Sequence, residues 1–239
     1  MIVCALGYGY LSKYVFRRIC GLGVTAIGVT SKQIKDDGFR NSIFVSREDI
    51  KKAISFSTHL LITAPPESKG CIIFNKFSDK ILSSNVKSII YISSTGVYGN
   101  HNGNWVNEKS LTKASSPFDK IRLKAEKQWE SFCSKHNINL NIVRIAGIYG
   151  PQRFINIHEK ELTVVLKKNH YFSRIHILDA ARLVSKIILE NHKDEVWNLA
   201  DDLPSSREAL LLEVIRVKKI AKFSTISYTK YSKNISERS

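Results

Sequence analysis

The sequence has few of the residues that build disulfide scaffolds, metal sites and membrane spans. It contains four cysteines among 239 residues, and none of them lies in a CxxC pair or near histidines at metal-binding spacing: Cys4, Cys20, Cys71 and Cys133. No apolar run reaches the roughly 18 residues of a transmembrane helix. We therefore expect free thiols in a reducing cytoplasm, no metal site and no membrane partner.

Acidic residues are also scarce: 21 Asp and Glu stand against 37 Lys and Arg, which gives a net charge of +16. Such a balance is typical of proteins that bind nucleic acid or another anion. The excess is spread evenly, however, because 1–120 and 121–239 each carry +8. The densest basic segment, 216–239, holds seven basic residues and one acid. Because the chain is also rich in Ile, Asn and Ser, an AT-rich genome explains most of this charge, and nucleic acid is not the expected partner.

Hydrophobic residues make up 43% of the chain, which is enough for a sizeable core. Short β-branched runs alternate with longer amphipathic stretches, as in a parallel sheet that is buried on both faces. The expected strands are 2–6, 24–29, 42–45, 59–64, 88–93 and 140–145, and the expected helices are 11–20, 47–55, 72–84 and 118–136. A strand and helix over 175–189, a strand at 196–199 and a helix over 206–221 follow. The pattern predicts an α/β fold with a doubly wound parallel sheet of the Rossmann type.

A glycine turn directly follows the first expected strand and opens the first helix. It comprises Gly7, Tyr8, Gly9, Tyr10, Leu11 and Ser12. In the dinucleotide-binding turn the first glycine permits a tight bend, the second lets the backbone approach a pyrophosphate, and the third position needs a small residue. Ser12 stands at that third position. The helix amino end also offers unpaired N–H groups to phosphates, so we predict a dinucleotide site.

The end of the second strand indicates which dinucleotide is bound. Thr30, Ser31 and Lys32 follow Val29, and no acid occurs before Asp36. An NAD site usually places an acid there to bind the ribose 2′-hydroxyl, whereas hydroxyls and an ammonium suit a 2′-phosphate. NADP(H) is therefore the preferred cofactor and NAD(H) the alternative. Lys32 could also be no more than a solvated loop lysine.

Three later segments carry a family resemblance: SSTGVYG at 93–99, RIAGIYGP at 144–151 and RIHILD at 174–179. With the glycine turn they resemble, in order over residues 1–200, the extended short-chain dehydrogenase/reductases. Within these the chain resembles the atypical NAD-dependent epimerase/dehydratase group. The resemblance implies an oxidoreductase or epimerase/dehydratase that moves a hydride between nicotinamide and a sugar-like or other hydroxylated small molecule. It also implies a homodimer through a four-helix interface.

The resemblance further implies a strand hydroxyl, here Ser94, and a Tyr-x-x-x-Lys pair on the next helix. Counting back from Glu126, the Tyr position holds Phe118 and the Lys position holds Arg122. Phe has no proton to give, and Arg stays protonated near neutral pH. Arg122 would still bind the nicotinamide ribose, and Ser94 with Thr95 the substrate oxygen; their alternative role is to cap the strand end.

The remaining cofactor neighbours implied by the family are Thr63, Ala64 and Pro65 at the fourth strand, Ser93, and Ala146, Gly147 and Ile148 after the sixth. The same reasoning divides the chain into an NAD(P)-binding domain, 1–150 rejoined by 174–200, and a small substrate lobe, 151–173 with 201–239.

Several other residues receive structural interpretations. Phe118 belongs by spacing to the buried face of its helix, together with Ile121, Ala125, Trp129, Phe132 and Cys133. Asp119 is expected to be solvated. Arg144 and Arg153 are expected to form surface ion pairs, with binding of a substrate phosphate or carboxylate as the alternative. Tyr98 is expected to be structural, and Lys120, Lys124 and His101 flank the site.

Two other functions remain open. A non-catalytic NAD(P)-binding sensor or scaffold explains why the cofactor frame is kept while Phe118 and Arg122 replace the acid/base pair. Nucleic-acid binding through 216–239 is the weaker alternative.

Overall fold

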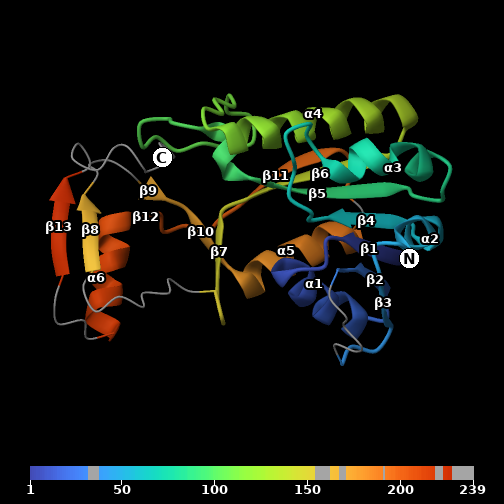
Figure 1. Cartoon of the computed structure of the whole chain (residues 1–239), viewed down its shortest axis with the longest axis horizontal. Coiled ribbons are helices and arrows are strands. Elements are labelled where there is room, and N and C mark those ends of the chain that lie inside the picture. The colour runs from blue at the N-terminus through green and yellow to red at the C-terminus, as the bar shows by residue number, and fades with distance from the viewer. Residues whose placement is uncertain (32–37, 154–161, 167–170, 191, 219–222, 228–239) are drawn as a thin grey trace.

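A seven-stranded parallel sheet forms the centre of the computed structural model, which describes residues 1–31, 38–153, 162–166, 171–190, 192–218 and 223–227 (Figure 1). Its strands run in the order β11-β6-β5-β4-β1-β2-β3, and every neighbouring pair is parallel. They are β1 (Ile2–Leu6), β2 (Thr25–Val29), β3 (Ser42–Val45), β4 (His59–Ile62), β5 (Ser88–Ser94), β6 (Asn139–Ile145) and β11 (Glu195–Leu199). This arrangement confirms the doubly wound sheet that the apolar runs predict.

Helices cover both faces of the sheet. On one face lie α1 (Tyr10–Gly21) and α5 (Ile177–Glu190), and on the other lie α2 (Ile50–Phe56), α3 (Ile72–Leu82) and α4 (Pro117–His136) (Figure 1). Alternate residues of β1 belong to the two cores: Val3 and Ala5 pack with α1 and α5, while Cys4 and Leu6 pack with the helices opposite. The continuous apolar run of β1 thus reflects a strand with no wet face.

A second group of elements lies beyond the carboxyl ends of the strands (Figure 1). β8 (Leu162–Leu166) pairs in parallel with β13 (Phe223–Ser227), and α6 (Arg207–Lys218) packs beside them. Two short pairs connect this group to the sheet: β9 (Tyr171–Phe172) with β12 (Ser205–Ser206), and β7 (Gly147–Tyr149) with β10 (Arg174–His176). The division of the chain into a cofactor domain and a lobe stays a prediction.

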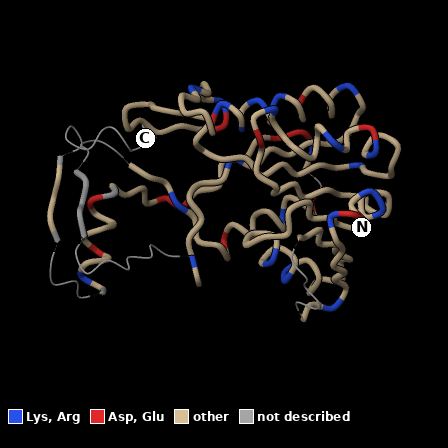
Figure 2. The backbone as a smooth tube through the Cα atoms, viewed as in Figure 1, with Lys and Arg blue, Asp and Glu red and all other residues tan. Residues whose placement is uncertain are grey.

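Basic residues are distributed over the helices of both layers rather than gathered on one face (Figure 2). Most of the basic segment 216–239 lies outside the described residues, so its proposed contact with nucleic acid has no structural counterpart here. Among the described residues, no helix combines the length and the apolar character that crossing a membrane requires.

All four cysteines are buried and free. Burial raises the pKa of Cys4 and of Cys133 to about 12, so both stay as unreactive thiols at neutral pH. We therefore expect the folded protein at pH 8 to react with Ellman's reagent far more slowly than the urea-unfolded protein, in which all four thiols become accessible. Rapid modification of the folded chain would contradict the buried placement.

Candidate functional site

A cleft of about 910 Å³ opens at the carboxyl edge of the sheet, where the strand order reverses between β1 and β4. This switch point is where open α/β sheets bind their ligands. Its walls include most of the predicted site residues: Gly7, Gly9, Tyr10, Leu11, Ser12, Thr63, Ser93, Ser94, Thr95, Arg122, Ala146, Gly147 and Ile148. Tyr8, Thr30, Ser31, Ala64 and Pro65 do not line it. Lys32 lies outside the described residues.

The backbone conformation at the first position of the turn requires a glycine, Gly7. Gly7 has φ +106°, and a Cβ there would lie 2.7 Å from the backbone nitrogen of Ala64. The hydroxyl of Thr63 donates to the Gly7 carbonyl, and the buried Ser12 hydroxyl donates to the same carbonyl at 3.3 Å. The Ser12 hydroxyl also lies 3.2 Å from the Thr63 hydroxyl, so the side chain at the third motif position links the turn to the residues that follow β4.

The second glycine of the turn, Gly9, borders open space. Gly9 is the N-cap of α1 with an extended backbone, and a Cβ there would meet only the Gly7 carbonyl oxygen, at 3.9 Å. No side chain caps the helix, and its first turn contains no acid. The amino end of α1 thus presents open N–H groups and an unopposed positive dipole to the cleft, which fits the pyrophosphate of a dinucleotide.

The end of β2 lies behind this turn. The backbone N–H of Tyr8 donates to the Val29 carbonyl at 2.9 Å, and the Tyr8 ring packs edge-on against Phe44. Both rings cover Gly28, where a Cβ would lie 2.8 Å from Phe44. Tyr8 therefore forms part of the scaffold beneath the turn, and half-buried Thr30 follows at its edge.

The end of β5 supplies the hydroxyl groups of the opposite wall. Ser94 accepts a hydrogen bond from the Gly96 N–H at 3.1 Å and so caps the short 3₁₀ helix η1 (Thr95–Tyr98). The side chain of Ser93 is buried and donates to Glu126. The capping role expected as an alternative for Ser94 is thus present, and Ser94 and Thr95 line the cleft as well.

A buried ion pair lies directly behind this wall. Arg144 Nη2 is 2.8 Å from Glu126 Oε2, and both side chains are almost fully enclosed. Arg144 also donates to the Tyr98 hydroxyl at 3.0 Å, which in turn donates to Asn198 at 2.8 Å. Burial alone lowers the pKa of Arg144, but the hydrogen bonds and charge of Glu126 outweigh it and raise that pKa above its ordinary value. The expected surface ion pair at Arg144 is therefore wrong.

The start of α4 departs from two further expectations. Phe118 is 75% exposed and does not line the cleft, whereas Asp119 is only 3% exposed. The Ser116 hydroxyl donates to the Asp119 carboxylate, which lies where a Cβ on Gly96 would be. This packing turns Asp119 inward and leaves Phe118 outside. Arg122, one turn further, lines the cleft and donates to the Ile92 carbonyl at 3.2 Å.

The charge of the cleft is positive. Among its described lining residues are the guanidinium groups of Arg122, Arg153 and Arg174, against the single carboxylate of Asp201. Arg153 lies 5.4 Å above the Tyr10 ring and forms no ion pair with another described residue, and the Tyr10 hydroxyl donates to the Pro151 carbonyl at 2.8 Å. Such a lining favours ligands that carry phosphate.

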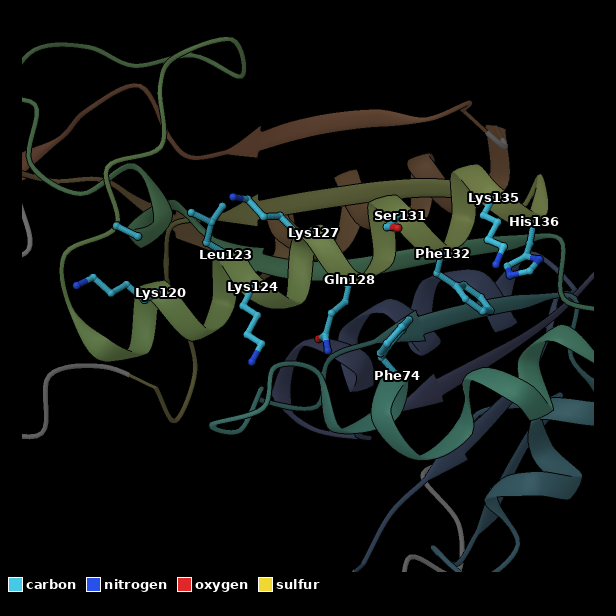
Figure 3. A pocket seen from close by; sticks show the side chains of 11 residues that line it. Phe74, Lys120, Leu123, Lys124, Lys127, Gln128, Ser131, Phe132, Lys135 and His136 are labelled. Atoms are coloured by element: carbon cyan, nitrogen blue, oxygen red, sulfur yellow. The ribbon is translucent and has the colours of Figure 1, made fainter.

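A second groove, of about 740 Å³, lies on the outer side of α4 (Figure 3). Phe74 of α3 and Phe132 of α4 form an aromatic contact there, with ring centroids 5.7 Å apart. Four lysines line the same groove: Lys120, Lys124, Lys127 and Lys135. Lys120 and Lys124, which flank the site in sequence, thus lie outside the cleft.

Sequence reasoning missed the buried network and the carboxyl-side wall of Trp105, Tyr171, Phe172 and Arg174. The sequence did contain a signal for the network: Arg144 is a charged residue inside the largely apolar strand 139–145, and such a residue needs a buried partner. The three aromatic residues of the wall had none, because they lie outside the recognised motifs, and the motif that begins at Arg174 did not indicate that this side chain lines a cleft. Among the described residues, no group of three His, Cys, Asp or Glu side chains could hold a metal ion.

The buried pair gives a stability prediction. We expect Glu126→Gln to lower the free energy of unfolding by about 3–5 kcal/mol, because it leaves the Arg144 charge buried without its partner. The matched control is Asp49→Asn, which breaks the exposed 3.2 Å pair with Lys52 and should cost less than about 1 kcal/mol. Urea denaturation measures both, and equal losses would contradict the assignment.

Comparison with known proteins places this geometry in a family. Residues 74–200 match the model of the NAD dependent epimerase/dehydratase family. A functionally unknown conserved protein from Silicibacter pomeroyi DSS is 26% identical, with a TM-score of 0.84 over 96% of this chain and 82% of its own. UDP-N-acetylglucosamine 4-epimerase from Bacillus cereus is 17% identical, with a TM-score of 0.78 over 95% and 84%.

MoeE5, solved in complex with UDP-glucuronic acid and NAD, is 13% identical, with a TM-score of 0.75 over 95% of this chain and 84% of its own. No curated protein matches. The family match covers more than half of the chain and agrees with the glycine turn, the sheet order and the cleft at the switch point. The chain belongs to the NAD dependent epimerase/dehydratase family.

Proposed function

We propose that this chain binds NADP(H), with NAD(H) as the alternative, and exchanges a hydride with a hydroxyl-bearing sugar nucleotide or a related small molecule. The observation that carries the proposal is the cleft: an open glycine turn, a helix amino end and three arginines meet at the switch point. The bound nicotinamide would supply the hydride chemistry. This chain's own residues bind it, orient it and hold the substrate oxygen.

The proposed cofactor contacts follow the turn. The backbone of Gly7 to Ser12 and the amino end of α1 hold the pyrophosphate, and Thr63 borders it; Ala64 and Pro65, which do not line the cleft, follow Thr63 in the chain. We assign the adenine ribose to the segment of Thr30, Ser31 and Lys32, of which Lys32 lies outside the described residues. The preference for NADP(H) rests on the absence of an acid at 29–31. MoeE5 was solved with NAD, so the preference for NADP(H) does not come from that comparison.

The nicotinamide end would lie between β5 and the 146–148 segment. Arg122 lines this part of the cleft, and its guanidinium suits the hydroxyls of the nicotinamide ribose. Ser93 is engaged with Glu126, so the hydroxyls of Ser94 and Thr95 are left to contact the substrate oxygen.

The far wall supports a phosphate-bearing substrate. Arg174 lies 5.8 Å from the centre of the Phe172 ring, and the exposed rings of Trp105 and Tyr171 line the same cleft. Aromatic faces beside a guanidinium suit a base or sugar joined to a diphosphate. UDP-glucose and UDP-N-acetylglucosamine are therefore the first probes to try.

The alternative, a non-catalytic NAD(P)-binding sensor or scaffold, is favoured by one observation: residue 118 brings no phenol to the cleft. A Phe118→Tyr, Arg122→Lys double variant restores the residues that the family resemblance implies. A gain of activity in it would separate the two functions, provided that the new tyrosine reached the substrate. Because Phe118 is exposed, the double variant is expected to gain no activity. Hydride transfer by the wild type is therefore the deciding measurement.

The two glycines give a prediction that separates cofactor binding from folding. Gly9→Ala is expected to weaken NADPH binding about tenfold, or ~1.4 kcal/mol, with little change in Tm, because its backbone is extended and only a ligand would meet the methyl group. Gly7→Ala is expected to lower Tm, since its φ is positive and its Cβ would overlap β4's end. Gly21→Ala, with open space around it, is the matched control.

Fluorescence titration with NADPH and NADH measures the binding, and thermal unfolding measures Tm. If neither cofactor binds at millimolar concentration, the proposed function is wrong. Tighter binding of NADH than of NADPH would overturn the cofactor preference alone.

The homodimer implied by the family also stays a proposal, and α4 makes it testable. Two copies that pair through α4 would bring Lys120, Lys124, Lys127 and Lys135 of each chain together (Figure 3). Salt screens such repulsion, so association through this face should strengthen from 50 to 500 mM NaCl. Sedimentation velocity at both concentrations measures it. A dimer that weakens with salt would contradict pairing through this face.

A further inference from the structure

Position 118, where the family resemblance implies a phenol, holds an exposed Phe that does not line the cleft. Hydride transfer to or from an alcohol carbon still requires a partner for the hydroxyl proton. Arginines cannot take this part near neutral pH. Apart from them, the titratable side chains that line the cleft within the described part of the chain are Tyr10, Tyr98, His101, Tyr171 and Asp201.

Four of these five groups are poorly suited to the role. Both hydrogen-bonding capacities of the Tyr98 hydroxyl are used by Arg144 and Asn198. Tyr10 donates to the Pro151 carbonyl. Tyr171 and Asp201 belong to the wall beside Arg174, which we assign to the phosphate-bearing end of the substrate.

His101 has the chemistry that the step requires. It follows η1 at the end of β5, and its half-buried ring lies against Tyr98 with centroids 6.5 Å apart. Its Nε2 lies 3.1 Å from the Leu111 carbonyl oxygen. A carbonyl only accepts, so the neutral ring carries its proton on Nε2 and keeps the lone pair on Nδ1. A backbone carbonyl that fixes the tautomer in this way is how proteins prepare a histidine base.

The loop that carries His101 is held in place by the fold. Gly99 has φ +68°, and a Cβ there would lie 2.0 Å from the Lys113 carbonyl oxygen, so the two segments touch closely. The Lys113 N–H donates to the Tyr98 carbonyl at 3.0 Å. These contacts close the loop between 99 and 113 and bring His101 to Leu111.

We propose that Nδ1 of His101 is the proton acceptor and donor for the substrate hydroxyl in this chain, in place of the missing phenol. The inference rests on the proposed function. In the oxidising direction the hydroxyl proton passes to Nδ1 and the carbon hydride passes to NAD(P)⁺. The alcohol becomes a carbonyl, the cofactor is reduced, and His101 is left protonated. The reverse step returns the proton to the oxygen and the hydride to the carbon.

Two measurements test this. The first uses UDP-glucose and UDP-N-acetylglucosamine deuterated on their hexose carbons, with deuterium on the extracted nicotinamide read by mass spectrometry. His101→Gln is expected to slow the transfer by about 10²–10⁴ while the Kd for NADPH stays within about twofold. His136→Gln, on the outer groove of α4, is the matched control and should transfer at the wild-type rate.

The second measurement needs no substrate. Long-range ¹H–¹⁵N spectra of the wild type at pH 8, assigned by comparison with His101→Gln, should show His101 protonated on Nε2. A neutral ring protonated on Nδ1 would overturn the proposal.

The outcomes are separable. Full transfer by His101→Gln would overturn the role of His101 and leave the proposed function intact. No transfer by the wild type from either probe, with NADPH bound, would overturn the catalytic part of the proposed function and the role of His101 with it. Loss of transfer in His101→Gln alone, with Nε2 protonated, supports the proposal.

Discussion

The buried pair between Glu126 and Arg144 is the interaction on which the site depends. It connects α4 to β6, and through Ser93, Tyr98 and Asn198 it reaches β5, η1 and β11. Two enclosed charges are stable only when their remaining hydrogen bonds are satisfied. Here the partners are side chains of the elements that form one wall of the cleft. The wall is therefore positioned by a polar network, and its geometry is more specific than apolar packing alone would make it.

The glycine turn is positioned by a different device. Gly7 lies so close to Ala64, just after β4, that only hydrogen fits there, and the hydroxyls of Thr63 and Ser12 donate to its carbonyl. The serine at the third motif position, which departs from the usual glycine, thus adds a hydrogen bond to the turn. Gly9 remains the position at which the backbone is open to a ligand. Rigidity at Gly7 and open space at Gly9 together leave the N–H groups at the amino end of α1 accessible, as the proposed pyrophosphate contact requires.

The sheet and its helices could be predicted because their signals are local: β-branched runs of four to seven residues, separated by amphipathic helices and glycine turns. The same patterns placed the cofactor turn and the end of β5 at one edge. Arg144, Asp119 and Phe118 were misplaced because their burial depends on partners distant in sequence or on the rotation of α4. The pairing of β8 with β13 joins segments about sixty residues apart, and no periodicity in either segment indicates it.

The rotation of α4 also explains how the chemistry of the site can differ from the family pattern while the cofactor frame is kept. Ser116 caps the helix and Asp119 packs beneath Gly96, so Asp119, Arg122 and Glu126 point inward. Phe118 lies about 100° from Asp119 around the helix and one turn before Arg122. At this position the Phe118 side chain is exposed. A phenol at this position would share that exposure unless the helix turned, and the Glu126 pair opposes such a turn. Under the proposed function the proton partner therefore belongs to another wall, and the loop closed by Gly99 and Lys113 places His101 in the lining of the cleft.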